Sequence, residues 1–114
     1  MDDNEEIIRT CALWYPHMEA IEARLAIGIE RYDHGVRVED DTTQWGTKTN
    51  SWLDMGLEEI DDLVIYVIAE CIRESRTGPQ EPWLRSRESG VRLDRYMKII
   101  KDLNIMRGRI VDLM

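Results

Sequence analysis

The chain has 114 residues, which is enough for one ordinary domain with its own core and too few for two. Its formal charge of −8 disfavours DNA, RNA and anionic membranes as partners, because phosphate binding relies on clustered Lys and Arg. The same charge is compatible with a single nucleotide, since divalent cations bridge carboxylates to phosphates. Apolar residues make up 43% and charged residues 33%, proportions typical of a folded, water-soluble protein.

The chain shows no sign of secretion or membrane insertion. Residues 1–6 are acidic and lack the apolar core of a signal peptide, and the longest apolar run, residues 63–69, is too short to span a bilayer. Cys11 and Cys71 both lie within apolar helical patterns, where a free thiol acts as a small hydrophobe. We therefore expect a cytoplasmic protein without disulfides.

The N-terminal third predicts two helices followed by a loop. Residues 3–15 begin with acidic side chains, which favour the first turn of a helix, and Pro16 separates this helix from the next. Residues 17–32 carry apolar side chains three and four positions apart, the spacing of an amphipathic helix. Residues 33–50 are rich in Gly, Asp and Thr and predict a loop, with a brief extended piece at 36–38.

The rest of the chain predicts two longer helices. Residues 51–76 form the strongest pattern, with Ser51 as the N-cap and Asp54 completing a capping box. Gly78, Pro79 and Pro82 are expected to end this helix and to form a turn before a last helix at residues 91–113. The sequence thus predicts a single all-α domain over residues 1–114, a bundle of about four helices. Residues 63–69 are apolar on every side, so we expect a second subunit to complete the bundle.

An acidic cluster comes immediately before that apolar segment, and its four members are Glu58, Glu59, Asp61 and Asp62. Residues three or four apart on a helix are neighbours, so Glu59 lies beside Asp62 and like charges accumulate. A solvated or salt-bridged surface is the simpler interpretation. However, Lys and Arg are absent between residues 50 and 72, so no cation on this helix compensates the cluster. Mg²⁺ would compensate it, because this ion prefers carboxylate oxygens.

The preceding helix carries a second acidic pair, Glu19 and Glu22, also one turn apart. Two helices that each contribute such a pair form a four-carboxylate metal site in helical bundles. Glu22 flanks the apolar stripe of its helix, whereas Glu19 lies further round. Glu30 is an alternative contributor.

The sequence LEEIDDLVIYV at residues 57–67 resembles the signature helix of the MazG-like, all-α nucleoside triphosphate pyrophosphohydrolases. That superfamily carries an ExxE pair on one helix and an ExxD pair on the next, and these acids hold Mg²⁺. The resemblance implies that Glu19 and Glu22 are the first pair and Glu59 and Asp62 the second. Residues 31–47 are also similar to small phage-encoded relatives, which would place the protein in the host cytoplasm. Relatives act as dimers or tetramers, so the resemblance also implies a homodimer or homotetramer.

The expected function is Mg²⁺-dependent cleavage of a nucleoside triphosphate into a monophosphate and pyrophosphate, with Mn²⁺ as a substitute ion. Glu58 is the expected general base. Candidate substrate-binding residues are four side chains: Arg31, Lys48, Lys98 and Trp45. Asp94 is a further candidate near the phosphates, and Trp52 is a second aromatic that either stacks on a base or packs in the core. The alternative is a non-catalytic helical interaction protein, including a family member that has lost catalysis.

Overall fold

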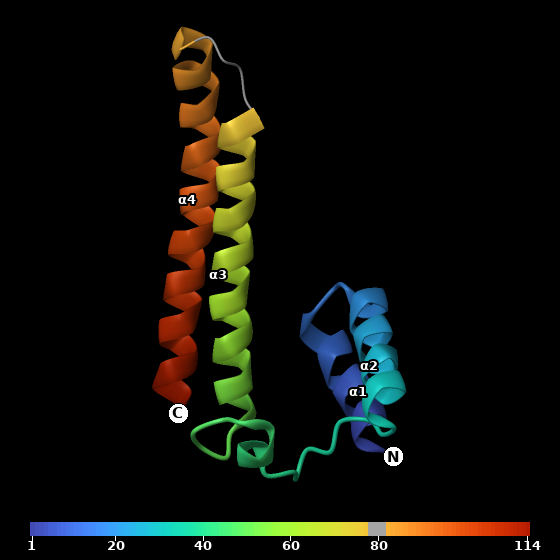
Figure 1. Ribbon diagram of the computed structural model, residues 1–114. Helices are drawn as coiled ribbons and strands as arrows, with labels where there is room; N and C mark the ends of the chain where they lie inside the picture. The colour runs from blue at the N-terminus through green and yellow to red at the C-terminus, as the bar shows by residue number, and fades with distance from the viewer. Residues whose placement is uncertain (78–81) are drawn as a thin grey trace. The chain divides into compact units, whose positions relative to one another are not determined.

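The computed structural model describes the chain apart from residues 78–81, and it describes side chains outside residues 77–91. In the described residues the chain contains four α-helices, one short 3₁₀ helix and no strand, which confirms the predicted all-α class (Figure 1). The elements are α1 (Asp3–Trp14), α2 (Met18–Tyr32), η1 (Thr42–Trp45), α3 (Trp52–Thr77) and α4 (Pro82–Leu113). They divide into two compact units, Met1–Asp40 and Asp41–Met114, and each unit is described by itself. A single domain over residues 1–114 stays a prediction.

In the first unit, α1 packs against α2. The Asp2 side chain caps α1 by accepting a hydrogen bond from the Glu5 amide at 2.8 Å. The turn between the helices contains Pro16, as predicted, and α2 ends at Asp33, whose backbone is left-handed with φ of 63°. Asp tolerates this conformation better than most residues because its short polar side chain forms local hydrogen bonds.

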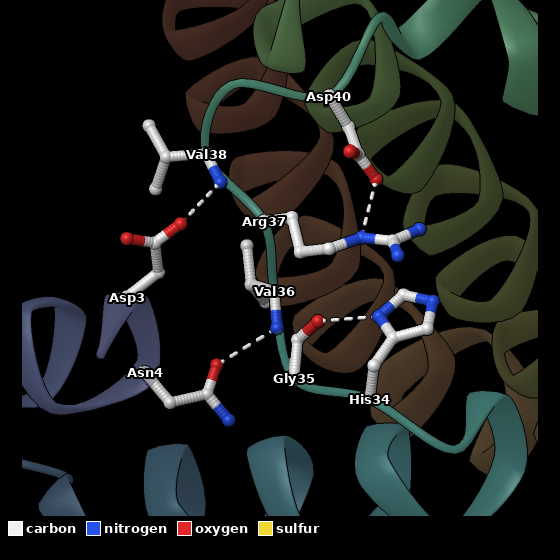
Figure 2. Close-up of polar contacts among 8 residues, drawn as sticks. All are labelled: Asp3, Asn4, His34, Gly35, Val36, Arg37, Val38 and Asp40. Carbon is white, nitrogen blue, oxygen red and sulfur yellow. Dashed lines mark hydrogen bonds and ion pairs between the residues drawn. The ribbon is translucent and has the colours of Figure 1, made fainter.

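The segment after α2 is attached to the start of α1 (Figure 2). The Val36 amide donates to Asn4 Oδ1 at 2.9 Å, and the Val38 amide donates to Asp3 Oδ2 at 2.7 Å. Gly35 has no room for a side chain, since an added Cβ would lie 2.8 Å from Asn4 Nδ2. Residues 36–38 therefore run along α1 without forming a strand, because their amides bond to side chains instead of to a neighbouring strand.

The second unit begins with a loop that is held together around Thr42, whose side chain is fully buried. Thr42 Oγ1 accepts a hydrogen bond from the Ser51 amide at 2.8 Å and bonds to Thr47 Oγ1 at 2.8 Å. The Thr42 amide donates to Asn50 Oδ1 at 3.0 Å. These bonds fold the loop back onto the residue that precedes α3 and so fix where that helix begins.

The loop's short 3₁₀ helix, η1, is capped by Asp41, whose carboxylate accepts hydrogen bonds from both the Thr43 hydroxyl and the Thr43 amide. These bonds lower the pKa of Asp41 below its ordinary value, and the bond from the Thr43 hydroxyl has the larger effect. Because folding lowers the pKa of Asp41, its ionised carboxylate stabilises the folded state. This contribution is complete above the pKa that Asp41 has in the unfolded chain, and therefore at neutral pH. It is lost as the pH falls through the lowered pKa of the folded state.

Replacing Thr42 with Val should destabilise the second unit by about 1–3 kcal/mol, because the substitution keeps the shape but leaves the Ser51 amide and Thr47 hydroxyl without this partner. Urea unfolding followed by circular dichroism measures the change. Thr43→Val is the matched control, since Thr43 is exposed, and about 0.5 kcal/mol is expected there. Equal losses at the two positions would show that the loop does not depend on the buried hydroxyl.

α3 and α4 form a long helical hairpin (Figure 1). One residue series on each helix faces the other helix, with spacings that alternate between four and three as in a coiled coil. We call these residues the seam; on α3 they are Leu53, Leu57, Ile60, Val64, Val67, Cys71 and Glu74, and on α4 they are Tyr96, Ile100, Leu103, Arg107 and Ile110. Among the described hydrophobic residues, only Ile60 and Leu103 reach burial typical of a core, at 8% and 7% exposure. No helix in the described part of the chain combines the length and apolar character needed to cross a membrane.

Two predicted features of these helices are wrong. α4 begins at Pro82, nine residues before the predicted start at Val91, because proline is favourable in the first turn of a helix even though it breaks the interior. The predicted capping box forms only in part. Ser51 Oγ does accept from the Leu53 amide at 3.1 Å, but Asp54 Oδ2 accepts from the Thr49 amide at 3.0 Å instead of reaching Ser51.

Candidate metal-binding face of α3

Glu59 and Asp62 lie on the second and third turns of α3 and are both exposed. They are one turn apart, so their carboxylates project from the same side of the helix. Neither forms an ion pair with any described residue. The next turn of this side carries Leu63 and Tyr66, which are 43% and 66% exposed. The acidic pair thus adjoins an apolar surface that a neighbouring helix would cover.

Asp61 has a different environment, because α4 provides it with a cation. Arg107 Nε donates to Asp61 Oδ1 at 3.0 Å, and this bond raises the pKa of the Arg107 guanidinium above its ordinary value. The expectation that the acidic cluster has no positive partner is therefore wrong for one of its four members. The compensating residue lies 46 positions away in the sequence, so spacing along one helix could not reveal it.

Glu58 is exposed and forms no ion pair with a described residue. It lies one turn before both Asp61 and Asp62 and therefore borders the Glu59–Asp62 pair on the outer side of α3. Its carboxylate is therefore accessible to solvent, and the role of general base stays a prediction.

The other predicted acidic pair, Glu19 and Glu22, is exposed on the first two turns of α2 and lacks an ion pair with the described residues. Glu30, the alternative contributor, is also exposed, near the other end of α2. α2 belongs to the first unit and α3 to the second. Within the described residues, no three His, Cys, Asp or Glu side chains gather in an arrangement that could hold a metal ion. Two carboxylates alone are few for Mg²⁺, which takes six ligands.

The predicted substrate-binding cations are distributed over the chain and are all exposed. Arg31 is in the last turn of α2, Lys48 is in the loop before α3, and Lys98 is in the middle of α4. None of them forms an ion pair with a described residue, so their charges are available to an anion. Asp94 is likewise exposed, on the same helix as Lys98.

The two tryptophans that flank the start of α3 are partly exposed. Trp45 ends η1 with 43% exposure, and Trp52 begins α3 with 38%. Both residues are therefore partly accessible to solvent, and neither is a core residue. Trp52 as a buried core aromatic is ruled out within its unit.

A pocket of about 380 Å³ lies in the first unit, and none of the predicted site residues lines it. It is lined by the start of α1, the end of α2 and the segment that follows α2, among them Asp3, Asn4, Ile29 and Arg37. Its two polar side chains from α1 already accept hydrogen bonds from Val36 and Val38, so they serve the fold of the unit. His34, close by, contacts the Gly35 carbonyl through Nδ1 at 2.6 Å.

Comparison with protein-family models, curated proteins and solved structures finds no match for the chain. The resemblance to the MazG-like pyrophosphohydrolases therefore rests on the residues of the sequence alone.

Proposed function

We propose that the protein is a Mg²⁺-dependent nucleoside triphosphate pyrophosphohydrolase of the MazG-like type, which releases a nucleoside monophosphate and pyrophosphate. The observation that supports this function best is the contrast between neighbouring acids on α3. Asp61 has a cation from α4, whereas Glu59 and Asp62 have none among the described residues. Like charges at this spacing on a helix repel each other, and a bound cation would remove that repulsion.

The proposed ligands have the chemistry that magnesium prefers, although the described residues do not bring three of them together. Glu59, Asp62, Glu22 and Glu19 offer only carboxylate oxygens, the ligands that this hard ion prefers. When bound, Mg²⁺ neutralises charge on the phosphates and lowers the pKa of a coordinated water.

The chain's own side chains supply the remaining roles. Glu58 accepts the proton of the attacking water, since its carboxylate is unpaired and borders the metal pair. Arg31, Lys48 and Lys98 provide positive charge for the phosphates, and Trp45 offers an exposed ring for the base. The proposed enzyme is a homodimer or homotetramer. A cytoplasmic enzyme, in a phage host if phage-encoded, fits this chemistry.

The function is tested by incubating the protein with Mg²⁺ and a panel of ordinary and modified nucleoside triphosphates. The expected products are the monophosphate and pyrophosphate in equal amounts, with Mn²⁺ supporting the same reaction. The Glu59→Gln variant provides the background. Monophosphate formation that does not exceed this background for any substrate would exclude the proposed activity.

A non-catalytic interaction protein is the second candidate, and the exposed apolar side chains of the hairpin favour it. Ile65, Ile68 and Ile72 form a stripe on α3 with exposures of 61%, 39% and 44%. A surface of this kind is typical of a protein contact. Calorimetric titration with Mg²⁺ and Mn²⁺ separates the two functions. An interaction protein shows no stoichiometric binding that depends on Asp62.

A further inference from the structure

One side of the α3–α4 hairpin carries apolar and charged residues in a matched arrangement. The residues that immediately precede seam positions lie on the same side of both helices, because α3 and α4 are antiparallel. We call this side the Glu59 face; the residues that matter on it are Glu59, Leu63 and Tyr66 of α3 and Asp102, Met106 and Arg109 of α4.

The described part of the hairpin neither covers the apolar side chains of the Glu59 face nor pairs the charges of Glu59 and Arg109. Leu63, Tyr66 and Met106 are 43%, 66% and 50% exposed, a large apolar area for two helices with a very small core. Glu59 and Arg109 form no ion pair with any described residue. The face therefore has both an apolar centre to bury and opposite charges to neutralise.

The hairpin's register shows which residues lie at the same height. Asp61 pairs with Arg107, and each step forward along α3 corresponds to a step backward along α4. Two steps from this pair, Glu59 is level with Arg109. Five steps in the other direction, Tyr66 is level with Asp102. The contact of Glu74 with Tyr96 and Arg92 at the far end agrees with the same register.

A second copy related by a two-fold axis parallel to the helices keeps every residue at its own height. It places α3 of one copy against α4 of the other in antiparallel orientation, which yields a four-helix bundle in which all neighbours are antiparallel. In that arrangement Glu59 faces Arg109 of the partner subunit, and the Tyr66 hydroxyl faces Asp102 of the partner subunit. Leu63 and Met106 then meet across the centre.

We propose that a second copy of this chain covers the Glu59 face in this register, so that its Arg109 lies beside Glu59. The inference rests on packing and charge and does not require the proposed function. If that function holds, Glu59 is shared between the metal ion and Arg109 of the partner subunit.

The charge pair is tested by sedimentation equilibrium without divalent metal or nucleotide. Glu59→Arg and Arg109→Glu are each expected to raise the dimer dissociation constant by about tenfold or more, and the double variant to restore it to within about threefold. Glu58→Arg and Lys101→Glu are matched controls, because they change the net charge equally on the same helices but lie off this face. Equal weakening by the controls, or no rescue in the double variant, would overturn the pairing.

The arrangement is tested separately by crosslinking in a Cys11→Ser, Cys71→Ala background. A chain with Leu63→Cys is mixed with a chain carrying Met106→Cys and treated with a short thiol-reactive crosslinker. Covalent dimers are expected from the mixture and not from either chain alone. Dimers from the Leu63→Cys chain alone would indicate a different symmetry. A protein that remains monomeric at tens of micromolar would show that no second copy covers the face.

Discussion

Asp62→Asn should abolish stoichiometric Mg²⁺ binding and lower nucleoside triphosphate hydrolysis by about 100-fold or more, whereas Asp61→Asn should leave both within about threefold. The two substitutions are chemically identical and occupy adjacent positions on α3. They differ because Asp61 is bonded to Arg107, while Asp62 has no ion pair with a described residue. Removing the Asp61 charge leaves an exposed Arg107, which water solvates at little cost.

Isothermal titration calorimetry with Mg²⁺ measures the binding, and chromatographic separation of monophosphate from triphosphate measures the activity. Thermal unfolding of both variants serves as the control for folding, and it should differ little from that of the original protein. If the two variants lost metal binding equally, the acidic cluster would act only through its total charge, and the assigned ligand pair would be wrong.

Ile60→Ala should destabilise the α3–α4 hairpin by about 2–4 kcal/mol, the largest effect we expect from one apolar substitution. Ile60 is 8% exposed and belongs to the seam with α4, so truncation removes buried contacts and leaves a cavity that a two-helix unit fills poorly. Ile65 is the matched control because it lies in the same helix and is 61% exposed. Ile65→Ala should change stability by about 0.5 kcal/mol or less.

Urea unfolding monitored by circular dichroism at 222 nm measures both differences in the free energy of unfolding, with 222 nm chosen because α-helices absorb there. The two substitutions have the same effect on helix propensity, so their difference isolates burial. A loss at Ile65 as large as that at Ile60 would indicate that a second helix covers the outer side of α3 in solution.

The helices themselves were predictable because their signals are local. The alternation of apolar side chains in residues 53–71 follows the turn of one helix and needs no distant partner. The sequence did not predict the start of α4 at Pro82, because proline has two opposite effects on helices. It breaks a helix interior but is favourable in the first turn, and the sequence alone does not show which effect applies. The bonding around Thr42 was missed as well, since Thr47 and Ser51 meet it only after the loop has folded.

Some features of the candidate site also followed from local sequence, whereas others depended on how the helices pack. The sequence by itself determined that Glu59 and Asp62 share one side of a helix, because that follows from helical periodicity. Only the tertiary structure decided which acid of the cluster is compensated, because Arg107 reaches Asp61 through the antiparallel register of α3 and α4. It also decided that Leu63 and Met106 remain exposed on one face, since a helix's partners depend on how it packs and not on its own periodicity.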